Sequence, residues 1–178
     1  LAKLRAKRFV LDGELVVPEG DTLSFEQLLM RIHPAQSRVT RLAREHPAWF
    51  IVFDLLVDEK GRSLVAEPLA ARRRALEAFF ERHGAAHPLL RLSPAATERK
   101  AAQAWLRGLG GGLDGVMAKR LDLPYQTGER SGMQKFKRMR TADCVVGGFR
   151  YASKAPLVGS LLLGLYDDAG LLHHIGFN

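Results

Sequence analysis

The 178-residue sequence contains one cysteine, Cys144, which excludes an intrachain disulfide framework and a metal site built from several cysteines. No stretch approaches the roughly 20 consecutive apolar residues that a membrane-spanning helix needs, and no secretory signal opens the chain. The sequence also lacks a Gly-x-x-x-x-Gly-Lys-Ser/Thr phosphate loop and a Gly-x-Ser-x-Gly nucleophile turn. We therefore expect a cytoplasmic protein without a membrane segment that is not a P-loop nucleotide enzyme.

Acidic residues are fewer than basic ones. The chain has 27 Lys and Arg residues against 19 Asp and Glu, which gives a formal charge of +8 at pH 7. Most of the excess lies between Lys119 and Lys154, where nine basic residues outnumber three acidic ones. Such a concentration of positive charge is typical of proteins that bind a polyanion, although a solvated basic surface would have the same composition.

Hydrophobic patterning predicts a mixed α+β arrangement over the first three quarters of the chain. Ser24 and Gln27 have the spacing of a capping box, in which Ser24 caps a helix and Gln27 reaches back. The nearly continuous apolar run Trp49–Val57 predicts a strand covered on both faces. The predicted strands are Phe9–Val17, Trp49–Val57, Leu89–Leu92, Leu113–Lys119 and Gln134–Arg138, and the predicted helices are Ser24–Ile32, Ser37–Glu45, Pro68–Arg82 and Pro94–Leu109.

The pattern changes near Arg140, and we expect two domains, residues 1–139 and 140–178. Beyond this point turn residues separate three strand-like segments, and no helical spacing occurs. These residues are too few to close a β-barrel. The three predicted strands are Cys144–Tyr151, Ser160–Tyr166 and Leu171–Phe177.

Two acidic residues stand on one predicted strand. Side chains alternate along a strand, so Asp12 and Glu14 share a face, with Cα atoms about 7 Å apart. Carboxylates among apolar neighbours need a cation, a metal ion or hydrogen-bond donors. The alternatives are a solvent-facing strand or a turn-capping role for Asp12. Asp114, after a run of glycines, is a candidate oxygen ligand for a divalent cation or a turn residue.

Two lysines share a face of another predicted strand. Lys135 and Lys137 flank Phe136, which points the other way. Neighbouring ammonium groups repel unless an anion lies between them, and a phosphate is the natural occupant. The alternative is a solvated surface strand. Phe53, in the most apolar run, is either a core residue or an aromatic surface on which a flat base stacks.

Four segments, taken in order, resemble motifs III, IIIa, IV and V of the covalent nucleotidyltransferases. They are FVLDGELVV, FIVFDLL, LDGVMAKR and GMQKFKRMR. Within that superfamily they are most similar to the ATP-dependent DNA ligases of bacteria. The tail beginning TADCVVGGFRY resembles the start of the oligonucleotide-binding (OB-fold) barrel that follows the catalytic domain in these ligases. The resemblance implies an α+β fold in which a partial adenylation domain with antiparallel sheets, residues 1–139, precedes the start of an OB-fold barrel, residues 140–178.

The resemblance also implies a reaction. A lysine attacks the α-phosphate of ATP, the lysyl-AMP passes its AMP to the 5′-phosphate of a nick in duplex DNA, and the 3′-hydroxyl displaces AMP. Mg²⁺ or Mn²⁺ and basic groups neutralise the phosphate charge. By position, Glu14 would contact the ribose or the metal, Phe53 would stack on adenine, and Asp114 would bind metal. Lys135 and Lys137 would be the catalytic residues of this chain, which hold the nucleotide phosphates and help to activate the nucleophilic lysine. Further candidates are Asp12, Arg120 and Lys119, and Lys119 would bind the nucleotide.

The sequence departs from this family at three places. Asp114 stands where the family usually has Glu, and Met133-Gln134 replaces a stretch that often carries Trp. The Lys-x-Asp-Gly string of the nucleophilic lysine is absent, so we expect this lysine to precede Leu1 and the 178 residues alone to be inactive. We expect a monomer acting in DNA repair, recombination or replication. The alternatives are an RNA ligase or capping-type nucleotidyltransferase, a non-catalytic nucleic-acid-binding module, and an inactive α/β fragment.

Overall fold

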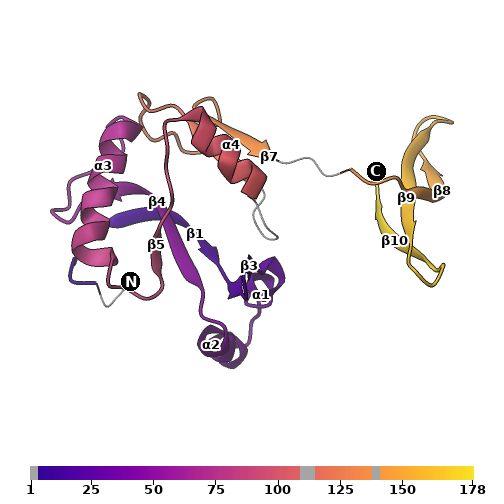
Figure 1. The fold of residues 1–178 in the computed structure, drawn as a ribbon, viewed down its shortest axis with the longest axis horizontal. Coiled ribbons are helices and arrows are strands. Elements are labelled where there is room, and N and C mark those ends of the chain that lie inside the picture. Colours follow the sequence, from indigo (N-terminus) through magenta and orange to yellow (C-terminus); the bar gives the residue numbers. More distant parts are fainter. Residues whose placement is uncertain (1–3, 109–114, 138–140) are drawn as a thin grey trace. The chain divides into compact units, whose positions relative to one another are not determined.

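A computed structural model describes residues 4–108, 115–137 and 141–178 of the chain (Figure 1). The chain forms two compact units, Leu1–Arg138 and Met139–Asn178, and each is described here by itself. None of the described helices is long and apolar enough to cross a membrane. That the two units are an adenylation domain and an incomplete OB-fold barrel stays a prediction.

The first unit is built on a three-stranded sheet in the order β1-β4-β5. The central strand β4 (Trp49–Val57) pairs antiparallel with β1 (Val10–Val16) and parallel with the short β5 (Leu90–Leu92). Helix α3 (Leu69–Phe79) packs against β4, because its apolar residues recur at helical spacing. Together they bury the core residues Leu4, Val52, Leu55, Leu64, Leu76, Phe79 and Leu90.

Every residue of β4 is buried or half-buried, as predicted for a strand covered on both faces, but the two faces are buried to different extents. Val52 is fully buried in the core beneath α3, whereas Ile51 and Phe53 on the other face are only half-buried. The pairing with β1 shifts register at this point. Asp12 faces Asp54 and Gly13 faces Val52, so Phe53 is an extra residue without a partner on β1.

A second, two-stranded sheet carries the predicted lysine pair. Strand β6 (Gly115–Lys119) pairs antiparallel with β7 (Met133–Lys137). The two backbones approach so closely that a Cβ atom on Gly115 would lie 2.0 Å from the carbonyl oxygen of Phe136. A glycine at this position therefore permits the pairing that sets the register of the lysines.

Several predicted helices are shorter in the structure. Ser24 caps α1 (Phe25–Leu29) by accepting from Gln27 N at 3.3 Å, but the Gln27 side chain does not reach back, since Ser24 N donates to Val17 O. Helix α3 ends at Phe79 because the chain widens into a π-helical turn, η1. Helix α4 begins at Arg99 rather than Pro94. The remaining elements are α2 (Gln36–Glu45), β2 (Pro18–Glu19), β3 (Thr22–Leu23), η1 (Phe80–Gly84) and α4 (Arg99–Gly108).

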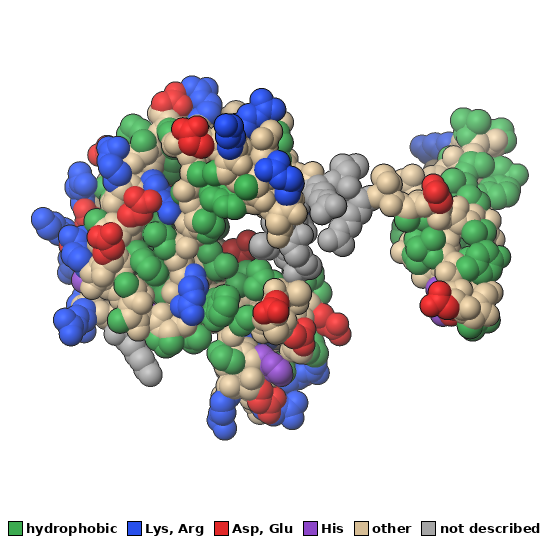
Figure 2. Space-filling view, in the orientation of Figure 1, with side chains coloured by type: hydrophobic (Ala, Val, Ile, Leu, Met, Phe, Trp, Pro, Cys, Tyr) green, Lys and Arg blue, Asp and Glu red, His purple; other side chains and the backbone are tan. Residues whose placement is uncertain are grey.

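The second unit is an antiparallel sheet in the order β10-β9-β8, so the three predicted strands are confirmed. Much of its apolar surface is exposed, as the green side chains on its visible face in Figure 2 show. Phe149 is 57% and Phe177 is 77% exposed. The strands are β8 (Val145–Tyr151), β9 (Val158–Tyr166) and β10 (Leu172–Phe177).

Candidate functional site

The face of the first sheet that lies away from the core carries an acidic residue beside an aromatic one. Glu14 is exposed in the middle of β1 and lies opposite Ile51 of β4, which in turn lies opposite Arg91 of β5. Phe53, the extra residue between Val52 and Asp54, likewise lies outside the core cluster. Glu14 and Phe53 thus lie on the neighbouring strands β1 and β4, and their roles stay predictions.

The second sheet presents three lysines on one face. Lys119 lies opposite Met133, Met117 opposite Lys135, and Gly115 opposite Lys137. Directly opposed residues of an antiparallel pair project to the same side, so Lys119, Lys135 and Lys137 share a face, which we call the lysine face. Lys135 and Lys137 are exposed. Three ammonium groups on one side of two strands can bind a polyphosphate.

Lys119 connects the lysine face with Phe53. Its Nζ atom lies 4.4 Å from the centroid of the Phe53 ring, within the range of a cation–π contact. Burial lowers the pKa of the Lys119 ammonium below its usual range, although the carboxylates of Asp54 and Asp12 oppose the shift. Lys119 and Phe53, more than 60 positions apart in the sequence, are thus in contact. This contact brings the aromatic ring of β4 next to the lysine face of β6 and β7.

The second carboxylate of β1 has a protein partner. Tyr125 OH donates to Asp12 Oδ2 at 2.8 Å, and this hydrogen bond is the main cause of a raised pKa for Tyr125. At least one oxygen of Asp12 is therefore engaged. Arg120, another candidate, is exposed and donates from Nε to Asp122 Oδ1 at 3.1 Å. Neither contact depends on a ligand.

A buried ion pair beside the site was missed by the sequence analysis. Arg72 of α3 donates from Nε and Nη2 to the two carboxylate oxygens of Asp54, both at 2.9 Å, and the two residues are only 3% and 2% exposed. The sequence did contain the signal. Asp54 lies inside a strand-length apolar run, and Arg72 lies at helical spacing with the apolar residues Leu69, Leu76 and Phe79. A charged side chain at either position needs a buried partner of opposite charge.

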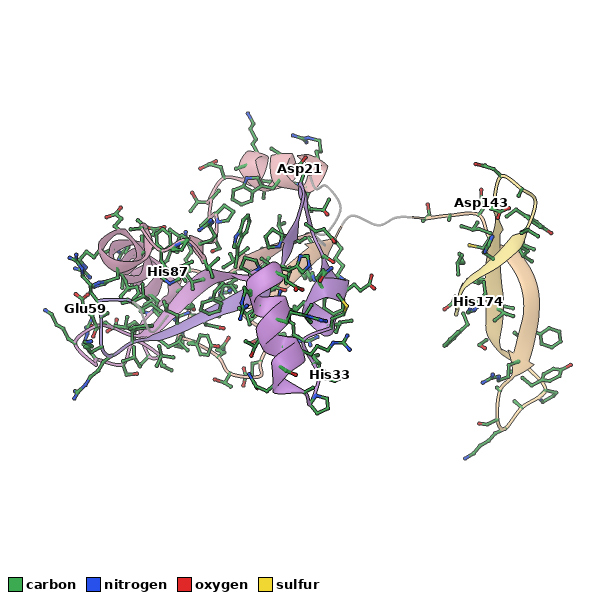
Figure 3. All side chains as sticks on the ribbon, turned by 90° about the horizontal axis from the view of Figure 1, so that it is seen from below. Asp21, His33, Glu59, His87, Asp143 and His174 are labelled. Carbon is green, nitrogen blue, oxygen red and sulfur yellow. The ribbon has the colours of Figure 1, made fainter. Side chains whose placement is uncertain are left out.

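The predicted metal ligands are only partly described. Asp114 lies outside the described residues. In the described part of the chain no three His, Cys, Asp or Glu side chains form a group that could hold a metal ion, and Asp21, His33 and Glu59 lie far apart on the first unit (Figure 3). Glu14 still fits Mg²⁺, because this ion is usually held by one or two carboxylates together with phosphates of the substrate.

Replacing Lys119 by methionine is expected to stabilise the chain at neutral pH. The folded chain holds the Lys119 proton less tightly than the unfolded chain, so its charge lowers the free energy of unfolding, and this cost disappears as pH rises through the pKa of Lys119. Lys119→Met should therefore raise the midpoint of thermal unfolding at pH 7 and raise it less above about pH 10.

Lys60→Met is the control, because Lys60 is exposed in a turn after β4. It should leave the midpoint unchanged at both pH values. A lower midpoint for Lys119→Met at pH 7 would mean that the buried charge stabilises the fold, contrary to this interpretation.

An aromatic ring, a carboxylate and the lysine face thus lie on two small sheets of the first unit, which the contact of Lys119 with Phe53 brings together. Residues 1–137 match the family described as "ATP dependent DNA ligase domain". The chain belongs to this family. It is 50% identical over 175 residues to DNA ligase C2 of Mycolicibacterium smegmatis and 44% identical over 186 residues to DNA ligase C of Mycobacterium tuberculosis.

The chain spans about half the length of these curated relatives, covering 47% and 50% of them, while they cover 95% and 99% of this chain. Among solved structures, "mycobacterial DNA ligase D complexed with ATP and MES" is similar at 30% identity with a TM-score of 0.54, over 95% of this chain and 49% of that one. A Lig E DNA ligase at 22% identity has a TM-score of 0.61, over 93% of this chain and 60% of that one, and supports the fold alone.

Proposed function

We propose that these residues form the nucleotide-binding part of an ATP-dependent DNA ligase that seals nicks in duplex DNA. The observation that carries the proposal is the contact of Lys119 with Phe53, because it joins the lysine face to the aromatic ring. Membership of the ATP-dependent ligase family supports ATP as the substrate. The excess of basic residues supports nucleic acid as the second substrate.

Each side of this site has a separate task. Phe53 stacks on the adenine, and the lysine face binds the phosphates and offsets the negative charge that develops during transfer of AMP. Glu14 contacts the ribose or holds a divalent cation. When bound, Mg²⁺ or Mn²⁺ would neutralise phosphate charge and orient the phosphates. Asp114 is proposed as a second carboxylate for that ion.

We also propose that a lysine outside these residues is the nucleophile, since the 178 residues contain no Lys-x-Asp-Gly string. The family resemblance supports a lysyl-AMP and then a DNA-adenylate intermediate. We place the protein in the cytoplasm as a monomer acting in DNA repair, recombination or replication. The single cysteine is consistent with a reducing compartment.

Two measurements test this function. The 178-residue chain should bind ATP in a calorimetric titration with magnesium. A chimera of M. smegmatis DNA ligase C2, in which this chain replaces the matched segment, should seal nicked DNA with ATP. In the chimera, Glu14→Gln should lower the sealing rate by about 100-fold or more, whereas Glu81→Gln, an exposed carboxylate of η1, should not.

Other results would identify the alternatives. Salt-sensitive DNA binding without ATP binding would indicate a non-catalytic nucleic-acid-binding module. A preference of the chimera for nicked RNA or for GTP would indicate an RNA ligase or a capping-type enzyme. A full sealing rate for Glu14→Gln would remove Glu14 from the site.

A further inference from the structure

The N-terminus of α3 is capped by a distant part of the chain. Pro68, at the N-cap position, provides no side-chain hydrogen bond. Two amides of the first helical turn donate instead to carbonyl oxygens of the loop between β6 and β7, residues 120–132, which we call the docking loop. These hydrogen bonds are Leu69 N to Leu123 O and Ala70 N to Leu121 O, each 2.9 Å long. The docking loop follows directly after Lys119, so these hydrogen bonds connect the strand that carries Lys119 to α3.

Arg72 ties the same loop to the first sheet. Its guanidinium binds both carboxylate oxygens of Asp54 on β4, and its Nη1 donates to Glu67 O at 2.6 Å and to Leu123 O at 3.3 Å. One buried side chain therefore contacts β4, the segment before α3 and the docking loop. The planar guanidinium offers several donors in a fixed geometry, so it restrains both the distance and the orientation of these elements.

Tyr125 makes the third attachment. Its backbone amide donates to Val65 O at 2.9 Å, and its hydroxyl donates to Asp12 on β1. The Tyr125 ring also lies 5.7 Å from Arg72 Cζ. The docking loop is thereby joined to β1, β4 and α3 by side chains that the sequence places far apart.

We propose that Arg72 and Tyr125 are positioning residues that set the spacing between the lysine face and Phe53, and with it the fit of a nucleoside triphosphate that contacts both. This inference rests on the proposed function. A triphosphate whose base lies on one sheet and whose phosphates lie on the other gains affinity only if the two are held at the matching distance. A ligand that contacts the lysine face alone has no such requirement.

The experiment compares two ligands on the 178-residue chain. ATP would bind both sides, whereas inorganic tripolyphosphate would bind only the lysine face. Tyr125→Phe keeps the ring and loses the hydroxyl, and Arg72→Lys keeps the charge and loses the planar fork. Each variant should weaken ATP binding by about tenfold and change tripolyphosphate binding by less than about twofold. Thermal unfolding is recorded for each variant to confirm that the chain folds.

Matched controls separate positioning from general loss of stability. Arg73→Lys alters an arginine of α3 that donates to Ser93 and Glu77, and Tyr151→Phe alters an exposed tyrosine of the second unit. Both should leave ATP binding unchanged. The positioning role is wrong if Tyr125→Phe and Arg72→Lys leave ATP binding intact, or if they weaken tripolyphosphate as much as ATP. A wild-type chain that binds neither ligand would instead overturn the proposed function, and the positioning role with it.

Discussion

Replacing Arg72 by methionine is expected to lower the free energy of unfolding of the first unit by about 3–5 kcal/mol, measured by urea or thermal unfolding of the chain. Asp54, at a position only 2% exposed, would lose both guanidinium donors. Burying an unpaired carboxylate costs far more than losing a surface ion pair.

The double variant Arg72→Met with Asp54→Leu tests the cause. Removing both charges eliminates the unpaired carboxylate, so most of the lost stability should return. Its affinity for ATP should stay low, because Leu123 O of the docking loop still lacks its Arg72 partner. If Arg72→Met costs less than about 1 kcal/mol, the loss of Arg72 does not leave an uncompensated carboxylate in the core, contrary to this interpretation.

Removing both lysines of β7 is expected to have the largest effect on ligand binding. Lys135→Ala with Lys137→Ala deletes two of the three cations on the lysine face. Hydrogen bonds to charged groups contribute about 1.5–3 kcal/mol each, so ATP affinity should fall on the order of 100-fold or more. Calorimetry over a range of salt concentrations measures this loss, and the remaining affinity should depend less on salt.

The comparison variant is Lys60→Ala with Lys154→Ala, which removes the same charge from two exposed positions that are not part of β6 or β7. It should leave ATP affinity within about twofold, because these charges are screened in solution. Equal losses in the two double variants would show that net charge, rather than the lysine face, binds the triphosphate.

Local patterns predicted most of the elements. Trp49–Val57 is a strand with the predicted bounds, because a nearly continuous apolar run of nine residues, rich in β-branched and aromatic side chains, favours a buried strand. The end of α3 was predicted too late, since the π-helical turn that follows it depends on Gly84, where a Cβ would lie 2.6 Å from the Phe80 ring. Local spacing does not reveal such packing.

The sequence by itself determined that Asp12 shares a strand face with Glu14, and Lys135 with Lys137. Side chains alternate between the two faces of any strand, because the backbone geometry requires it. The order of its motifs also determined the family. Only the tertiary structure decided that Lys119 lies against Phe53, that Asp54 binds Arg72, and that Tyr125 holds Asp12. These contacts join residues from 18 to 113 positions apart, and they depend on strand register and helix packing, which no local pattern specifies.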